Sequence, residues 1–157
     1  MVFRGESHQG VIGLVAAKAY DTEEQILSRV ASQQDPPFLL ALDGIEDPQN
    51  LGQIVRTSEC AGIDGIILAK HGGTHITDSV LQVSQGAFLN LPIYMIGNIS
   101  QTLLSLKKEG FWIIGVENSV DASNWHDIDY SGKIIFVFGS EGRGIKSNTL
   151  KKCDEYG

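Results

Sequence analysis

Short apolar runs separated by helix-like polar segments recur along the chain and constrain its fold more than any other feature. Most of these runs are apolar at consecutive positions and do not alternate with polar residues, as is typical of strands covered on both faces. The pattern predicts an α/β fold, with a mainly parallel sheet flanked by helices. The expected strands are VIGLVA (11–16), FLLAL (38–42), GIILA (65–69), PIYMI (92–96), FWIIGV (111–116) and KIIFVF (133–138).

Capping signals predict the helices between these strands. A polar residue that can accept a backbone hydrogen bond stands before each apolar stripe, and glycine follows two of the stripes. The first expected helix covers 21–33 and is capped by Asp21 or Thr22, with Glu24 or Gln25 at capping-box spacing. The second begins at Pro48, is capped by Asp47 and ends before Gly62, and the third covers 78–88. The fourth is capped by Asn98 or Ser100 and ends at Gly110, and a short fifth helix is capped by Ser147 and runs through Leu150.

The length of 157 residues suits a single domain with one core. Within it, QDPPF (34–38) is the one plausible boundary, because Pro36 and Pro37 must end the preceding helix. We therefore expect residues 1–35 to be a joining segment that carries the first strand and helix, and residues 36–157 to form the main domain. No apolar run approaches the roughly 20 residues that cross a bilayer, and no signal peptide is evident, so a cytoplasmic protein without a membrane partner is expected.

The charge of the chain counts against a nonspecific nucleic-acid binder. The net charge is −7, with a pI of about 4.9, whereas phosphate affinity depends on clustered Lys and Arg. Positive charge is nevertheless uneven, since residues 71–106 contain no Lys or Arg while five basic residues gather near the C-terminus: Lys133, Arg143, Lys146, Lys151 and Lys152. Net acidity therefore hides a local basic region.

Metal chemistry and aromatic recognition find little support in the sequence. Cys60 and Cys153 are far apart, and the glycines within HGGTH (71–75) argue against a helical His pair, so neither a disulfide nor a metal site is predicted. Trp112 is expected in the core. Trp125 and Tyr130 lie in a polar connection, where surface packing is favoured over base stacking.

Two segments that follow predicted strands carry candidate chemistry. LDGIEDPQNLGQIVRTSECAG (42–62) places Gly52 four residues before Arg56, which is expected to open space on one helix face for a phosphate-binding guanidinium. Taken alone, the segment also fits an exposed helical arginine beside an Asp-Pro turn. FVFGSEGRGI (136–145) has GxxGxG spacing, which fits either a ligand loop or a purely structural turn and is not a dinucleotide or phosphate-loop fingerprint.

Together, the two segments resemble the SpoU, or TrmH-like, branch of the SPOUT RNA methyltransferases. The residues that match the two family motifs are Asn50, Gly52 and Arg56 in the first and Gly139, Glu141, Gly142 and Gly144 in the second. HQGVIG (8–13) is similar to the segment that joins an accessory RNA-binding domain to the catalytic domain, and SVLQVSQGAFLNLPI (79–93) is similar to the stretch between the motifs. The family's third motif, an SLNVS-type segment that completes a trefoil knot, is absent and would follow residue 157.

The resemblance implies an S-adenosylmethionine-dependent enzyme that methylates a ribose 2′-hydroxyl in tRNA or rRNA and acts as a homodimer. It places Arg56 at the reacting hydroxyl, with Asn50 and Glu141 in the same polar cluster, and implies RNA contacts for Arg56 and Arg143. It further implies that Gly139, Glu141 and Gly142, with Val116 and Glu117, contact the methyl donor. A noncatalytic RNA-binding or assembly domain of the same fold remains the alternative, and a flavodoxin-like nucleotide domain is a weaker third one.

Overall fold

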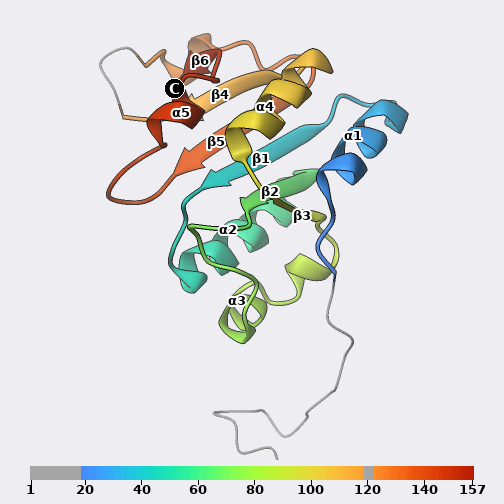
Figure 1. Ribbon diagram of the computed structural model, residues 1–157, viewed down its shortest axis with the longest axis vertical. Coiled ribbons are helices and arrows are strands. Elements are labelled where there is room, and N and C mark those ends of the chain that lie inside the picture. The colour runs from blue at the N-terminus through green and yellow to red at the C-terminus, as the bar shows by residue number, and fades with distance from the viewer. Residues whose placement is uncertain (1–18, 119–121) are drawn as a thin grey trace, which may run out of the picture.

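The computed structural model describes residues 19–118 and 122–157 and contains a parallel sheet with helices on both faces (Figure 1). The strand order is β3-β2-β1-β5-β4-β6. The strands are β1 (Phe38–Asp43), β2 (Gly65–Ala69), β3 (Ile93–Ile96), β4 (Trp112–Val116), β5 (Ile134–Gly139) and β6 (Glu155–Tyr156). Five predicted strands are confirmed within one residue at each end, the expected strand at 11–16 lies outside the described residues, and β6 was not predicted.

The helices follow their capping signals closely. Thr22 and Gln25 form a capping box at the start of the first helix, while the side chains of Asp47 and Asn98 each accept a hydrogen bond from the first turn of theirs. The helices are α1 (Glu23–Ser32), α2 (Pro48–Cys60), α3 (Asp78–Val83), α4 (Ile99–Lys108) and α5 (Ser147–Leu150), with 3₁₀ turns η1 (Ala87–Leu89) and η2 (Trp125–Asp127).

Two helix predictions were wrong in detail. The helix expected over 78–88 stops at Val83, because Gln85 and Gly86 adopt φ values of 53° and 87°, which a right-handed helix cannot contain. Ser147 is the first residue of α5 and not its cap; Lys146 holds the capping position and makes no side-chain capping bond.

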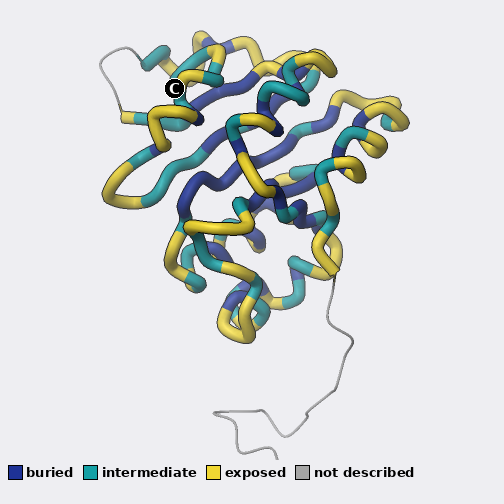
Figure 2. The backbone as a smooth tube through the Cα atoms, viewed as in Figure 1, coloured by how far each residue is buried: buried dark blue, intermediate teal, exposed yellow. Residues whose placement is uncertain are grey.

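The central strands of the sheet are buried along most of their length (Figure 2), and apolar side chains form core clusters on both faces. On one face, Ile26 of α1 and Leu103 of α4 join a core cluster with all of the first five strands. On the other face, Leu51 and Val55 of α2 and Val80 of α3 pack on β1, β2 and β3. Coverage of both faces is the reason that these strands read as continuous apolar runs.

Helix α1 belongs to this packing although it precedes the predicted boundary at QDPPF. Ile26 is completely buried, and Asp21 just before the helix exchanges backbone hydrogen bonds with Ile93 and Met95 at β3. The division between residues 1–35 and 36–157 stays a prediction. No helix in the described part of the chain combines the length and apolar character needed to span a bilayer.

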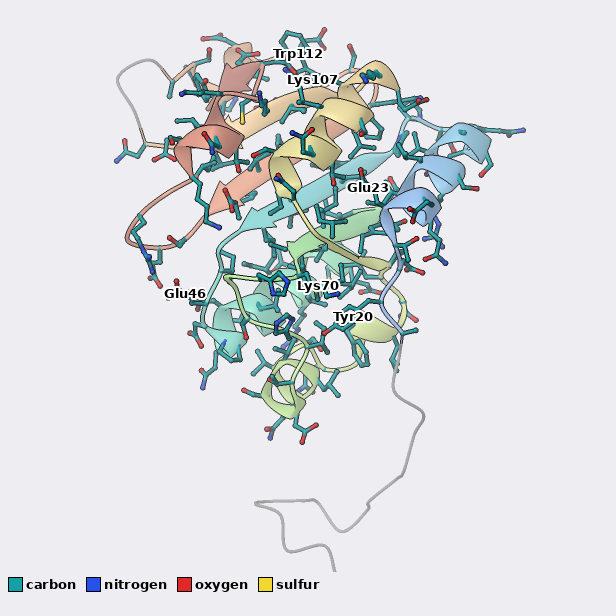
Figure 3. All side chains as sticks on the ribbon, viewed as in Figure 1. Tyr20, Glu23, Glu46, Lys70, Lys107 and Trp112 are labelled. Atoms are coloured by element: carbon teal, nitrogen blue, oxygen red, sulfur yellow. The ribbon has the colours of Figure 1, made fainter. Side chains whose placement is uncertain are left out.

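Of the three aromatic residues singled out in the sequence, Trp112 is more exposed than predicted, whereas Trp125 and Tyr130 lie where they were expected. Trp112, the first residue of β4, is 45% exposed and not part of the core, because the neighbouring β6 pairs only with Ile114 and Gly115 (Figure 3). Trp125 and Tyr130 stack with ring centroids 6.4 Å apart and remain at the surface, which confirms the expected surface packing.

The strand order reverses direction between β1 and β5. The chain builds outward from β1 through β2 to β3, and then β5 pairs with the opposite edge of β1, with Asp43 in register with Gly139. In open α/β sheets, the carboxyl edge at such a reversal is the usual place for a ligand. The two segments that carry the sequence motifs both leave the sheet at this edge.

Candidate functional site

The candidate site consists of the loop from β1 to α2 and the loop from β5 to α5. Both loops leave the carboxyl edge of the sheet from neighbouring strands. The Asp47 side chain caps α2 by accepting a hydrogen bond from the Gln49 N–H at 2.9 Å, which fixes the direction in which the helix starts. The first turn of α2 consequently faces the second loop.

A direct hydrogen bond joins the two loops. The Nδ2 of Asn50 donates to Oε2 of Glu141 at 3.2 Å. The structure therefore brings together two of the three predicted catalytic residues, 91 positions apart in the chain. A carboxylate has several acceptor positions, and the amide of Asn50 occupies only one of them, so Glu141 can still accept a bond from a ligand.

The loop after β5 folds back sharply on itself. Ser140 and Gly144 exchange backbone hydrogen bonds of 3.1 and 2.8 Å across the turn. A Cβ on Gly139 would overlap the carbonyl carbon of Gly144 and the nitrogen of Ile145, and Gly144 has a φ of +65°. Gly139 and Gly144 are thus required by the loop's own conformation, whatever ligand it binds.

Glu117, just past β4, holds this loop in place. Its Oε2 accepts a hydrogen bond from the Ile145 N–H at 3.1 Å, and a Cβ on Gly144 would lie 2.7 Å from its Oε1. The predicted contact of Glu117 with the methyl donor stays a prediction. In this structure, the Glu117 carboxylate fixes the conformation of the loop through its hydrogen bond with Ile145. Val116, the preceding residue, is partly buried at the end of β4.

Gly142 differs from the other glycines of the loop. It is exposed, its φ is not positive, and a Cβ placed on it would meet no atom within 4 Å. Nothing in the described fold requires glycine at this position. An absent side chain here leaves the loop backbone open to close approach by a ligand.

Arg56 does not join the cluster formed by Asn50 and Glu141. It lies six positions after Asn50 on α2, which separates them by about 9 Å along the axis and a third of a turn around it. Arg56 is exposed, and no hydrogen bond or ion pair connects it to any residue that the structure describes. Its guanidinium is therefore available to an incoming anion.

The expectation that Gly52 opens space beside Arg56 was wrong. Gly52 is buried, and a Cβ placed on it would lie 2.7 Å from Cβ of Val83 and 3.2 Å from the Val80 carbonyl oxygen. Because residue 52 has no side chain, α3 packs closely against α2, and residues of α3 fill the space beside Gly52. Gly52 serves packing between helices, and Arg56 projects from another part of the α2 surface.

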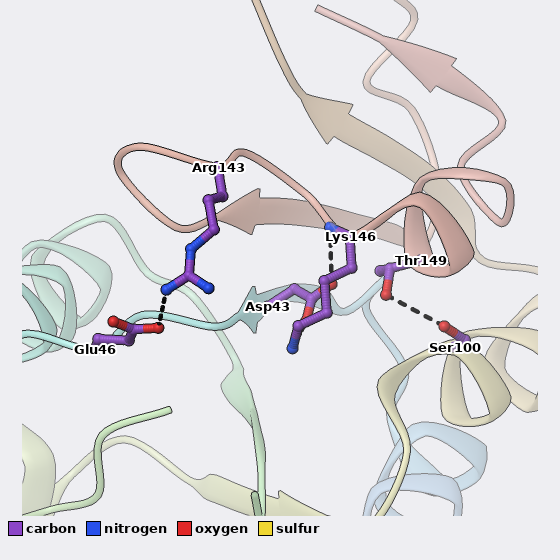
Figure 4. Close-up of polar contacts among 6 residues, drawn as sticks. All are labelled: Asp43, Glu46, Ser100, Arg143, Lys146 and Thr149. Carbon is purple, nitrogen blue, oxygen red and sulfur yellow. Dashed lines mark hydrogen bonds and ion pairs between the residues drawn. The ribbon is translucent and has the colours of Figure 1, made fainter. Parts of the chain in front are cut away.

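Arg143 makes an ion pair at the surface. Its Nη2 lies 2.6 Å from Oε1 of Glu46, and the two side chains are 78% and 64% exposed (Figure 4). Exposed pairs of this kind contribute about 0–1 kcal/mol. A phosphate can therefore replace Glu46 as the partner of Arg143 at small cost.

Sequence reasoning missed the ion pair between Asp43 and Lys146. Asp43 is 2% exposed at the end of β1, and its carboxylate accepts hydrogen bonds from the Lys146 backbone N–H at 3.2 Å and from Nζ at 2.9 Å (Figure 4). The signal was a carboxylate placed directly after a continuously apolar strand. This pair joins the end of β1 to the loop after β5 and so links the two chain segments a second time.

The remaining candidates form no site of their own. His71 and His75 are both exposed, and no group of three or more His, Cys, Asp or Glu residues within residues 19–118 and 122–157 is arranged to hold a metal ion.

This geometry defines a class of protein. It is a parallel α/β domain in which two loops from adjacent central strands, joined by polar contacts, form a potential ligand site at the carboxyl edge of the sheet. The model of the SpoU rRNA Methylase family matches residues 37–157, and the chain belongs to this family.

Individual relatives agree with this assignment. A Staphylococcus aureus (strain MSSA476) protein assigned to the TrmH family of tRNA/rRNA methyltransferases is 36% identical over 149 residues, 95% of this chain and 60% of its own length. The chain thus spans about 60% of that relative. The structure of an AdoMet-bound rRNA methyltransferase from Sinorhizobium meliloti shares the fold with a TM-score of 0.72 and 22% identity, covering 88% of this chain and 51% of that one. An RNA 2′-O ribose methyltransferase structure shares it with a TM-score of 0.67 and 21% identity, covering 82% and 50%.

Proposed function

We propose that this chain is the main part of a methyltransferase that transfers a methyl group from S-adenosylmethionine to a ribose 2′-hydroxyl in tRNA or rRNA. The observation that carries the proposal is the pairing of Asn50 with Glu141 across two loops that match the family's first two motifs. Such an enzyme would act in the cytoplasm as a homodimer.

S-adenosylmethionine, when bound, supplies an electrophilic methyl group on a sulfonium sulfur. The residues suited to hold it are on the loop after β5, where the backbone at Gly142 is open and Glu141 retains free lone pairs. Val116 and Glu117 lie at the end of β4, beside the base of the same loop. We assign no geometry to the cofactor beyond these neighbours.

Arg56 is suited to act on the RNA and not as a proton acceptor. A guanidinium remains protonated at neutral pH, so it cannot remove the proton of a hydroxyl group. Its planar fork can bind a phosphate through two parallel hydrogen bonds and stabilise negative charge that develops on the adjacent ribose oxygen. The phosphate that it binds is then the group placed to share the proton.

Positioning is the main contribution expected from the remaining residues. Holding the hydroxyl oxygen in line with the methyl carbon can supply roughly 7–11 kcal/mol of the barrier. Asn50 and Glu141, held by their mutual hydrogen bond, would orient the ribose, while Arg143 would exchange Glu46 for a phosphate.

The test is to incubate the protein with tritiated S-adenosylmethionine and unmodified tRNA or rRNA transcripts, and to digest the product to nucleosides. A labelled 2′-O-methylnucleoside supports the proposal. Calorimetry with S-adenosylmethionine should be run on this chain and on one that continues about 40 residues past Gly157. Donor binding by neither chain, with RNA still bound, would favour the noncatalytic RNA-binding domain.

A further inference from the structure

A cavity of about 450 Å³ opens at the carboxyl edge of the sheet, on the face covered by α4 and α5. It lies between the start of α4 (98–101) and the segment from Lys146 to Lys152. The cavity contains neither Arg56 nor the pair of Asn50 and Glu141. Asp43 and Lys146 connect it to the two loops of the candidate site, whereas the start of α4 and residues Lys151 and Lys152 extend it beyond them.

The lining of the cavity is strongly basic. Lys146, Lys151 and Lys152 line it together with His71, and Asp43 is the single carboxylate among the lining residues. Asp43 is already paired with Lys146, whereas Lys151 and Lys152 form no ion pair with any residue that the structure describes. In a chain of net charge −7, this local excess of positive charge requires a specific explanation.

The floor of the cavity is ordered by polar contacts. The hydroxyl oxygens of Ser100 and Thr149 lie 3.2 Å apart and hydrogen-bond to each other, which ties α4 to α5 (Figure 4). Thr149 is 3% exposed, and the first turn of α4 carries no acidic residue. The lysines thus lie around a polar surface that this hydrogen bond fixes. The first turn of α4 contributes no negative charge that would repel a bound anion.

The position of the cavity favours an extended polyanion over a small one. The loop from β5 to α5 carries Arg143 on its outer turn and Lys146 three residues later, and α2 with Arg56 covers the opposite face of the sheet. A ligand that contacts both the lysines of the cavity and Arg56 on the other face must pass over the carboxyl edge of the sheet between β1 and β5. A nucleic-acid strand with regularly spaced phosphates can do so.

We infer that this cavity binds backbone phosphates of the RNA substrate, through Lys151 and Lys152, away from the nucleotide that is methylated. The inference rests on the proposed function. Such contacts set register without reading sequence, and each one adds to the salt dependence of binding. They would allow an acidic domain to hold RNA by concentrating its positive charge in one place.

The test compares salt dependence of RNA binding between two double variants with equal change in net charge. Lys151→Gln/Lys152→Gln neutralises the cavity. Lys108→Gln/Lys133→Gln neutralises two lysines on the side of the sheet where the strands begin: Lys108 at the end of α4 and Lys133 just before β5. Affinity for a fluorescent unmodified tRNA transcript is measured from 50 to 200 mM salt, the range in which phosphate contacts weaken strongly.

The expected result is a slope of log affinity against log salt that is shallower by about 1.4–1.8 in the cavity variant, or about 0.7–0.9 for each lost phosphate contact. The slope of the control variant should match the unmodified protein. Equal slopes in all three proteins, an equal reduction in both variants, or no RNA binding by the unmodified protein would overturn the inference. S-adenosylmethionine binding and methyl transfer are measured on the same samples and report on the proposed function separately. If the protein methylates RNA but the slopes are unchanged, only the inference about the cavity is rejected and the proposed function stands.

Discussion

Glycine serves two different purposes within the single loop after β5. At position 139, the fold itself leaves no room for a side chain, since the chain returns across the end of β5. At position 142, the fold leaves ample room and the glycine has no structural requirement. The resemblance to the family assigned both residues to the cofactor, and only the path of the backbone distinguishes them.

The two glycines make a matched pair for a stability measurement. Gly139→Ala should lower the free energy of unfolding by about 1–3 kcal/mol or more, because the new methyl group overlaps backbone atoms. Gly142→Ala should stay within about 0.5 kcal/mol of the unmodified protein. Urea unfolding measures both changes, and equal effects of the two substitutions would contradict the distinction.

Arg56→Lys tests the geometry of the guanidinium while retaining its charge. Methyl transfer should fall by at least tenfold, because an ammonium cannot make the two parallel bonds to a phosphate. Binding of S-adenosylmethionine, followed by calorimetry, should be unchanged. Arg29→Lys makes the same exchange on α1 and serves as control, and near-normal turnover by Arg56→Lys would reject the phosphate-clamp role.

At the scale of elements, the contact between α2 and α3 depends on Gly52. The close approach of Val83 to this position explains a glycine in the middle of a thirteen-residue helix, where it otherwise costs about 0.5–1 kcal/mol relative to alanine. The helix pair in turn covers one face of β1 and β2.

A double-mutant cycle measures this packing. Gly52→Ala should destabilise the protein by about 1–3 kcal/mol despite its better helix propensity, because Cβ of Val83 cannot move aside as a flexible side chain would. In a Val83→Gly background, the same substitution should cost markedly less, since both Cβ and Cγ1 of Val83 have been removed. Additive effects in urea unfolding would show that Gly52 does not act through Val83.

Much of the element structure was predictable because its causes are local. Thr22, Asp47 and Asn98 cap helices through side chains that lie next to the residues they bond. The parts that could not be predicted depend on residues distant in the sequence. Strand β6 is only two residues long and forms against β4, and Asp43 meets Lys146 from 103 positions away.

The same distinction applies to the candidate site. The sequence located both loops, and the resemblance to a known family predicted that Asn50 and Glu141 share one cluster. In the structure, the two side chains are joined by a hydrogen bond, while their catalytic role stays a prediction. The separate position of Arg56 follows from helix geometry and could have been predicted from its spacing to Asn50. The tethering role of Glu117 could not, because no local pattern connects it to Ile145.

At the scale of the whole molecule, burial of titratable groups sets a limit on stability at alkaline pH. Burial raises the pKa of the Cys153 thiol from 9.0 to about 11, and it raises the pKa of the buried Tyr94 hydroxyl above its usual 10.0. The folded protein therefore retains these protons to higher pH than the unfolded chain does. By linkage, these two groups lower the stability of the fold as the pH rises above about 9, where the thiol of the unfolded chain begins to ionise.

The free energy of unfolding should accordingly decrease between pH 9 and pH 11, as measured by urea unfolding at each pH. Cys153→Ala should flatten this part of the profile, whereas Cys60→Ala at an exposed position should leave it unchanged. At pH 8, a thiol reagent should label Cys60 rapidly and Cys153 only on unfolding, because the thiolate is the reactive form. Equal labelling rates in the folded protein would show that Cys153 is not protected.

The adjacency of β1 and β5 has a consequence for how this protein is made. During synthesis, β1, β2 and β3 leave the ribosome first, and the free edge of β1 then lacks a partner until β5 follows. At about 5–20 residues per second, a separation of 103 positions between Asp43 and Lys146 corresponds to a delay of roughly 5–20 s. Throughout that interval, an apolar strand edge is open to mispairing, and chaperones would have to shield it. The same strand pairing that assembles the site therefore makes the nascent chain vulnerable until nearly all of these residues have been translated.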